Sequence, residues 1–155
     1  MTGRPGISAR PLTLALGALL AACGTAPGLS LCLAPDGRFE LHYVHSAERS
    51  PVVERYRVDA QGRLWLEGMR FRSLGWGMPA DGFVRRAGWF ETTTPPRRLD
   101  EFVLRVSRLA GQELRAAGRV LVLSAVARDG AALRVEAAST PSCPRLLVLR
   151  QGPDP

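Results

Sequence analysis

The feature that most constrains the fold of this chain is a series of short apolar runs, separated by turn signals, that continues from residue 38 almost to the end. Residues 38–45 and 52–58 alternate between apolar and polar side chains, the period of a strand with one buried face. Asp59-Ala-Gln-Gly62 follows as a type I turn, and a third run occupies residues 64–71. No segment after residue 22 sustains a helical period. The pattern predicts an all-β domain, a single antiparallel β-sandwich or partly open barrel built from hairpins.

Shorter apolar runs predict the remaining strands. They are residues 83–84, 89–90, 102–106, 120–127, 131–138 and 146–149. Arg128-Asp129-Gly130 favours a hairpin between residues 120–127 and 131–138. We expect a loop at residues 92–98 and one or two helical turns at residues 108–117.

The N-terminus has the pattern of an export signal. A polar stretch with two arginines precedes an uncharged apolar run that ends at residues 20–24, Leu-Ala-Ala-Cys-Gly. This ending resembles the bacterial lipobox, in which the cysteine receives a lipid with acyl chains such as palmitate. We therefore expect a lipoprotein signal peptide at 1–22, a tether at 23–30, a β domain at 31–150 and a tail at 151–155.

Two alternatives to lipidation of Cys23 stay open. An ordinary signal peptide would be cut near Ala22 and leave a free thiol, whereas an uncleaved anchor would use residues 11–34. A spanning helix needs about 20 apolar residues, and Gly24, Pro27 and Gly28 would interrupt this one. All three readings place the domain outside the cytoplasm, in the cell envelope, and the favoured one anchors it to the membrane by lipid.

The cysteine count agrees with export. If Cys23 carries lipid, Cys32 and Cys143 remain, and an even remainder in an oxidising compartment suggests one disulfide between the first strand and the last segment. Two buried free thiols are the alternative.

The charge is strongly basic. All 21 basic residues are arginines against 14 acids, and they are scattered along the strands with doublets only at 85–86 and 97–98. Nucleic-acid binding would need clustering on one face and does not suit an exported protein. Attraction to the anionic membrane surface beside the anchor fits better.

The first predicted hairpin contains a candidate polar pair. A register that pairs Tyr43 with Glu54 and His45 with Val52 turns the alternating apolar side chains of both strands inward. It also turns His45 and Glu54 inward as diagonal neighbours. They would form either a buried structural pair with the Tyr43 hydroxyl or two groups of a ligand or metal pocket.

A metal would need a third ligand, for which Glu67 is the candidate. A plain two-residue loop would turn Glu67 inward, opposite Glu54. A hairpin with Gly62 as a bulge, which we favour, turns Glu67 outward and disfavours a metal site. Ser46 lies on the opposite face from His45, and no Gly-x-Ser-x-Gly elbow is present. We therefore expect neither an enzyme nor a cofactor.

A composite motif spans residues 39–79. It reads Phe39-x-Leu41-x-Tyr43-x-His45-Ser46, then Pro51-x-x-Glu54, then Phe71-x-Ser73-x-Gly75-x-Gly77-x-Pro79. The motif resembles bacterial domain of unknown function family 1850, from whose usual residues Ala47, Trp76 and Met78 depart. The resemblance implies a bacterial envelope protein of no established activity. It also implies association with tripartite ATP-independent periplasmic (TRAP) transporters, in particular those with a TAXI-type solute receptor.

The glycine-punctuated stretch 73–79 has two interpretations. Its backbone amides could hold an anion beside Arg70 and Arg72, or its glycines could form a tight turn. Trp76 and Met78 would suit a partner surface.

The sequence thus favours a non-enzymatic accessory or binding domain that docks a TRAP permease or solute receptor. A stand-alone small-ligand or metal-binding lipoprotein centred on His45 and Glu54 is the alternative, and a hydrolase is the least favoured class.

Overall fold

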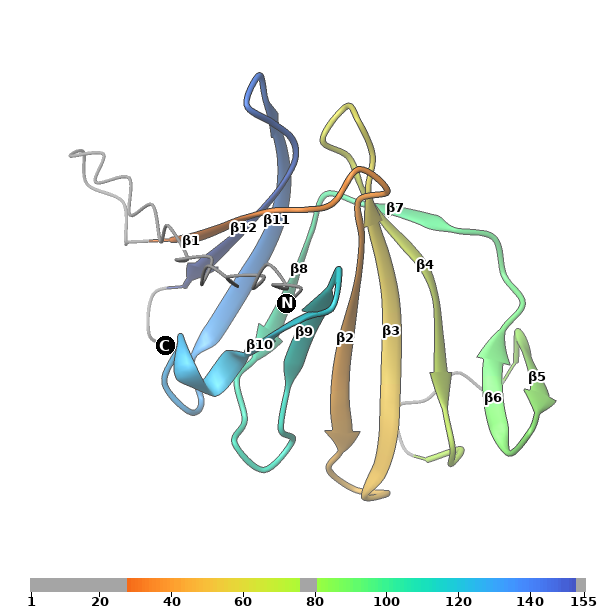
Figure 1. Cartoon of the computed structure of the whole chain (residues 1–155). Coiled ribbons are helices and arrows are strands. Elements are labelled where there is room, and N and C mark those ends of the chain that lie inside the picture. The colour runs from red at the N-terminus through yellow and green to blue at the C-terminus, as the bar shows by residue number, and fades with distance from the viewer. Residues whose placement is uncertain (1–27, 76–80, 153–155) are drawn as a thin grey trace, which may run out of the picture.

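The computed structural model describes residues 28–75 and 81–152 as two antiparallel β-sheets (Figure 1). The small sheet has four strands in the order β1-β12-β11-β8. The large sheet has eight, in the order β10-β9-β2-β3-β4-β6-β5, with β7 also paired to β4. The strands are β1 Leu29–Cys32, β2 Arg38–His45, β3 Ser50–Val58, β4 Leu64–Phe71, β5 Phe83–Arg86, β6 Trp89–Thr92, β7 Arg97–Leu99, β8 Glu101–Arg105, β9 Glu113–Ala116, β10 Arg119–Val122, β11 Ala132–Thr140 and β12 Cys143–Gln151, and a 3-10 helix, η1, spans Leu123–Ala125.

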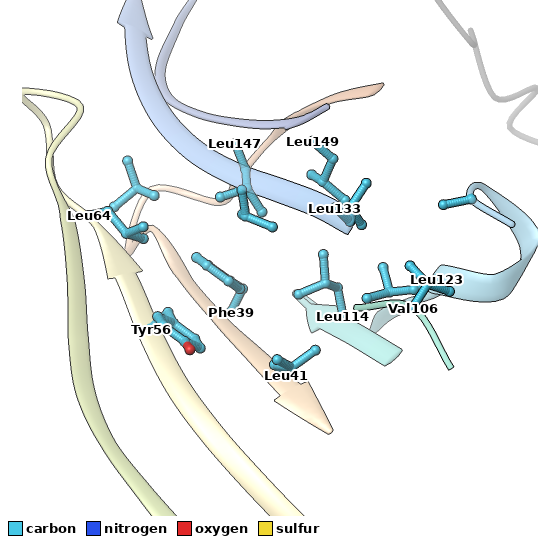
Figure 2. Close-up of a cluster of buried hydrophobic side chains, with 13 residues drawn as sticks. Phe39, Leu41, Tyr56, Leu64, Val106, Leu114, Leu123, Leu133, Leu147 and Leu149 are labelled. Carbon is cyan, nitrogen blue, oxygen red and sulfur yellow. The ribbon is translucent and has the colours of Figure 1, made fainter. Parts of the chain in front are cut away.

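The two sheets pack face to face and do not close into a barrel, which confirms the predicted all-β class. The core between them contains aliphatic side chains from both sheets, the aromatic rings of Phe39 and Tyr56, and Leu123 of η1 (Figure 2). The Tyr56 ring stacks on Phe39 at 5.1 Å and on Phe102 at 4.7 Å between centroids. Because Phe102 belongs to the small sheet, this stack joins the layers. Each fully buried core side chain contributes about 1.5–3 kcal/mol.

The turn between β3 and β4 has the predicted form, and its first residue explains why. Gly62 has φ +73° and donates its N–H to the Asp59 carbonyl at 3.0 Å. The Asp59 carboxylate accepts the N–H groups of Gln61 and Arg63, each at 3.0 Å, and also the Arg63 guanidinium and the Trp65 indole at 2.7 and 3.0 Å. Burial alone would raise the pKa of this carboxyl, but the four hydrogen bonds outweigh burial and lower the pKa well below its ordinary value.

The β2–β3 hairpin has the predicted inward face but a different register. Tyr43 pairs with Val52, and His45 pairs with Ser50, two residues from the predicted partners. A shift of two leaves every side chain on the same face, so the alternation could not distinguish the two registers. The loop is consequently short, and it is closed by the N–H of Arg49, which donates to the His45 carbonyl at 2.8 Å.

Two other sequence-based predictions of local structure are wrong, and a third is partly right. Residues 108–117 contain strand β9 instead of helical turns. The predicted loop 92–98 is present at residues 93–96, but its first residue ends β6 and its last two belong to β7. The predicted hairpin around Arg128-Asp129-Gly130 does not form, because β10 belongs to the large sheet and β11 to the small one. The apolar run at 120–127 ends as a strand at Val122, since Leu123 turns into the core and is fully buried.

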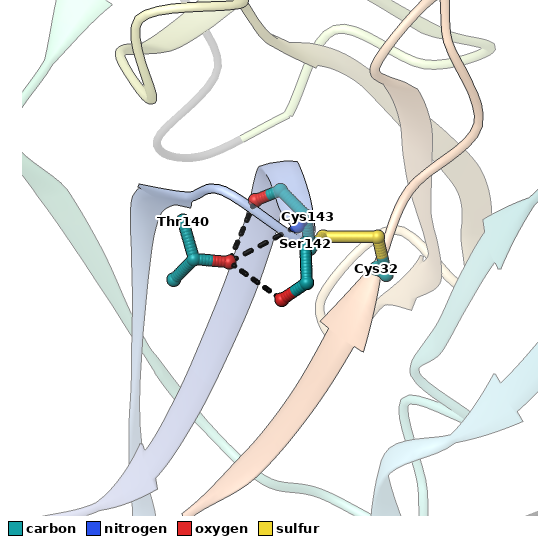
Figure 3. The surroundings of a disulfide bond; sticks show 4 residues. All are labelled: Cys32, Thr140, Ser142 and Cys143. Atoms are coloured by element: carbon teal, nitrogen blue, oxygen red, sulfur yellow. Dashed lines mark hydrogen bonds between the residues drawn. A yellow bond between two sulfur atoms is a disulfide. The ribbon is translucent and has the colours of Figure 1, made fainter.

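A disulfide joins Cys32, at the end of β1, to Cys143, at the start of β12, as predicted (Figure 3). Their Cα atoms are 5.7 Å apart and 111 positions separate them in the sequence. The Thr140 hydroxyl accepts the Cys143 N–H at 3.0 Å and donates to the Cys143 carbonyl at 3.3 Å, which holds the turn before β12.

The first and last described strands give the extent of the sandwich. β1 starts at Leu29 and β12 ends at Gln151. The predicted signal peptide at 1–22 and Cys23 lie outside the described residues. Over 28–75 and 81–152, no helix is long and apolar enough to cross a membrane.

Candidate functional site

A carboxylate on the inner face of the large sheet is held by two tyrosines. The Tyr43 hydroxyl donates to Glu54 Oε1 at 2.9 Å, and the Tyr56 hydroxyl donates to Glu54 Oε2 at 2.5 Å. Glu54 and Tyr56 share a face because they are two positions apart on β3, and Tyr43 reaches them diagonally from β2. We call these three residues the Glu54 cluster.

The environment of the cluster keeps both phenols protonated. Burial is the largest cause that raises the pKa of Tyr43 and Tyr56, followed by the negative charge of Glu54 and by the hydrogen bond to it. Both pKa values therefore lie well above the ordinary tyrosine range. The chain contains only these two tyrosines, so any tyrosinate signal of the protein reports on this cluster.

The predicted contact between His45 and Glu54 is replaced by another. His45 Nδ1 accepts the N–H of Glu48 at 3.4 Å inside the β2–β3 loop. Over the described residues no hydrogen bond or ion pair joins His45 to Glu54. The observed register pairs His45 with Ser50, two residues further from Glu54 than the predicted partner Val52. Glu54 instead binds Tyr43 and Tyr56, and the sequence interpretation left out Tyr56. The signal was present in the spacing of Glu54 and Tyr56, two apart on one strand.

Several family-motif residues gather at the end of the sheet around Glu48. The Ser73 hydroxyl donates to Glu48 Oε2 at 3.1 Å. A Cβ atom at Gly75 would collide with the Glu48 side chain, so glycine there allows the close approach. We call this contact of Glu48 with Ser73 and Gly75 the Glu48 bridge.

Other motif residues lie beside the bridge or beyond what the structure describes. Ser46 is exposed in the β2–β3 loop, and Pro51 is exposed on β3. Gly77 and Pro79 lie outside the described residues, as do Trp76 and Met78, so the two interpretations of the glycine-punctuated stretch stay predictions.

Glu67 points to the outer face of the large sheet, as the Gly62 bulge predicts. Its carboxylate binds Arg38 at 3.2 Å and Arg57 at 2.7 Å. Glu54 and Glu67 are therefore on opposite faces and cannot share a ligand. Among the residues that the structure describes, no three His, Cys, Asp or Glu side chains gather as a set that could hold a metal ion.

A shallow groove of about 470 Å³ lies away from both clusters. It is lined by residues 36–40 at the start of β2 and by residues 115–120 of the β9–β10 hairpin. The lining of the groove contains three basic residues, Arg38, Arg115 and Arg119, and two acidic residues, Asp36 and Glu40. Glu54 does not line this groove.

The fold and these clusters define an open antiparallel β-sandwich domain with one disulfide and a tyrosine-bound carboxylate on its inner face. Residues 39–123 match the family described as Domain of unknown function (DUF1850). The match covers more than half of the chain, so the chain belongs to this family. It takes in the strands from β2 to β10 and leaves out β1, β11 and β12 of the small sheet. No curated protein and no solved structure matches the chain.

Proposed function

We propose that the chain is a non-enzymatic accessory domain of the cell envelope, anchored by lipid on Cys23, that assists a TRAP-type transporter with a TAXI receptor. The observation that carries the location is the Cys32–Cys143 disulfide, since such bonds persist in oxidising compartments outside the cytoplasm. The transporter association follows from the family resemblance, and the lipid from the lipobox-like sequence.

The non-enzymatic part of the proposal rests on how the polar side chains are used. Both oxygens of Glu54 accept tyrosine hydroxyls, and His45 Nδ1 accepts a backbone N–H. Nucleophilic catalysis needs a base in reach of a nucleophile and a third group that orients the base. The hydrogen bonds of His45 include no nucleophile, and the raised pKa values of Tyr43 and Tyr56 keep the two phenols that contact Glu54 protonated, which makes a hydrolase the least favoured class.

The end of the large sheet around the Glu48 bridge is the surface that we propose for docking a permease or solute receptor. Leu74, between Ser73 and Gly75, is 53 % exposed, and an exposed leucine held by a fixed loop suits the centre of a small interface. The bridge fixes the loop because Glu48 binds it from the neighbouring hairpin.

The test is a crosslink and pull-down from native membranes, read by mass spectrometry. The intact chain should recover a TRAP permease or receptor, and Cys23→Ser should recover less because the domain is no longer held at the membrane. Leu74→Glu should also reduce recovery. Val103→Glu is the matched control, since Val103 is 55 % exposed on the small sheet. Recovery of no transporter component by the intact chain would overturn the proposal.

The alternative function, a stand-alone small-ligand or metal-binding lipoprotein, is favoured by one observation. Glu54 and Tyr43 are only partly buried, so a ligand could compete for the carboxylate. A shift in melting temperature with a small cationic ligand, lost in Glu54→Gln, would support this alternative. Unchanged melting with zinc, calcium or a chelator would count against a metal.

A further inference from the structure

The outer face of the large sheet carries two tryptophans, each stacked with two arginines. The guanidinium carbons of Arg70 and Arg72 lie 4.9 and 4.8 Å from the Trp89 ring centroid. Those of Arg57 and Arg63 both lie 5.9 Å from the Trp65 centroid. Such cation–π contacts hold the guanidinium groups over the faces of the rings.

These stacks belong to one face because of the strand register. Arg57 pairs with Trp65 across β3 and β4, and Arg70 pairs with Glu91 across β4 and β6, two residues from Trp89 on the same strand. Paired residues share a face. Between the stacks Arg55 pairs with Gly68. A Cβ atom at Gly68 would lie 3.4 Å from the Arg55 guanidinium, so the absent side chain leaves room for that cation.

Part of this charge is not neutralised within the domain. Glu67 binds Arg57, and Asp59 binds Arg63. Over residues 28–75 and 81–152, by contrast, Arg55, Arg70 and Arg72 form no ion pair with a carboxylate. The Nε atoms of Arg55 and Arg70 are buried and have no hydrogen-bond partner there either. Two guanidinium groups without a carboxylate partner, those of Arg70 and Arg72, thus lie on the Trp89 ring, and a third, that of Arg55, lies on the neighbouring strand.

We propose that the outer face of β3, β4 and β6 binds the surface of an anionic phospholipid bilayer. Guanidinium groups bind phosphate with charge-assisted hydrogen bonds, and tryptophan favours the depth of the headgroups, where its ring is half apolar and half polar. The inference deepens the envelope location proposed above. It does not need the transporter, so the pull-down and the vesicle experiment can fail separately.

The test uses the full-length chain with Cys23→Ser, so that no lipid anchor contributes. Sedimentation with phosphatidylcholine vesicles is compared with sedimentation with phosphatidylcholine–phosphatidylglycerol vesicles at low salt. Any contribution of the apolar N-terminal segment enters both, so the ratio of the two affinities is the readout. We expect a ratio well above one that falls as salt rises.

The double variant Arg70→Gln/Arg72→Gln should lower this ratio by about 25-fold, about fivefold for each arginine near an anionic surface. Arg134→Gln/Arg150→Gln is the matched control, since it removes the same charge from the outer face of the small sheet. The control should change the ratio less than twofold. Arg72→Gln alone, at an exposed position, should give about fivefold and tests the proposal if the double variant is poorly folded.

A second readout asks whether the face itself meets the lipid. Brominated lipids should quench the tryptophan fluorescence of the bound protein, and Trp89→Phe should remove part of that quenching. Equal binding to neutral and anionic vesicles would overturn the proposal. So would an equal loss in the Arg134/Arg150 control, because binding would then follow net charge and not this face.

Discussion

The large and the small sheet both carry arginines on their outer faces, but the side chains beside those arginines differ. On the small sheet Arg134 binds Glu101 at 2.7 Å and Arg150 lies 3.6 Å from Glu136. On the large sheet Arg70 and Arg72 stack on Trp89 instead. Surface ion pairs of the first kind add about 0–1 kcal/mol to stability. The difference therefore concerns what each face can bind much more than how firmly the sandwich is held together.

The inner faces differ as well. The described inner face of the small sheet is apolar, with Leu133, Val135, Leu147 and Leu149 in the core. The large sheet continues from a similar core to the Glu54 cluster, where a partly exposed carboxylate replaces an aliphatic side chain. One sheet thus serves packing on its inner side, whereas the other combines packing with polar groups that a partner or ligand can reach.

The largest expected effect concerns the edge of the small sheet. Cys32→Ser removes the disulfide that closes the long loop to Cys143, and the free energy of unfolding should fall by about 4–5 kcal/mol. Urea unfolding should give the same free energy of unfolding for the variant and for the reduced wild type. An unchanged unfolding midpoint in both would show that the small sheet does not depend on the bond.

The next effect tests the polar part of the large sheet. Glu54→Gln replaces a charged acceptor of two tyrosine hydroxyls by a neutral one, and stability should fall by about 1.5–3 kcal/mol. The pKa of both tyrosines should fall, yet stay above the ordinary value because burial remains. Ultraviolet titration of tyrosinate measures this directly, since no other tyrosine contributes.

The wild type in the same titration is the reference. It should show little tyrosinate near pH 11, one unit above the ordinary tyrosine pKa of about 10. A folded wild type whose tyrosines titrate at their ordinary pKa would contradict the hydrogen bonds to Glu54.

A smaller effect depends on pH and on the turn between β3 and β4. The pKa of Asp59 is lower in the folded than in the unfolded chain, so its contribution to stability is complete above about pH 4 and declines as pH falls below that value. Asp59→Asn should lower stability at neutral pH by about 1–2 kcal/mol. Urea unfolding between neutral and acidic pH should show that the variant loses less stability on acidification than the wild type does.

The smallest effect is expected on the outer face of the small sheet. Glu101→Gln breaks the ion pair with Arg134. The free energy of unfolding, measured in urea, should change by less than about 1 kcal/mol because both side chains are partly exposed. The same variant leaves Arg134 unpaired. If the outer face of the small sheet in this variant binds anionic vesicles as strongly as the outer face of the large sheet does, then the arginine–tryptophan stacks do not explain the difference between the two faces.

Much of the local structure could be predicted from the sequence, whereas the partners could not. Alternation in residues 38–45 and the apolar run at 64–71 predicted strands with the observed bounds, and the Asp59–Gly62 turn oriented Glu67 correctly. Alternation fixes a face but not a register, because a shift by two keeps the face unchanged. The His45–Glu54 contact depended on that register, and the structure brings Tyr56 to Glu54 in its place.

The sheet order could not be predicted for a related reason. Arg128-Asp129-Gly130 is a good turn sequence, yet it connects strands of different sheets. A turn motif reports only local backbone geometry and does not say which strands pair.

The Glu48 bridge was also missed. Glu48 and Ser73 are 25 positions apart, and neither residue carries a local pattern that indicates the other.

The position of the disulfide has a mechanical consequence. Among the described strands, β1 lies at the edge of the small sheet and has β12 as its one neighbour. Tension applied to the chain ahead of β1, as a membrane tether would apply it, would peel this strand from Leu29 onward, one backbone pair at a time. The peeling reaches the covalent bridge at Cys32 and stops there. The load then passes to β12, which is flanked by strands on both sides, and the rest of the sandwich keeps its shape under force.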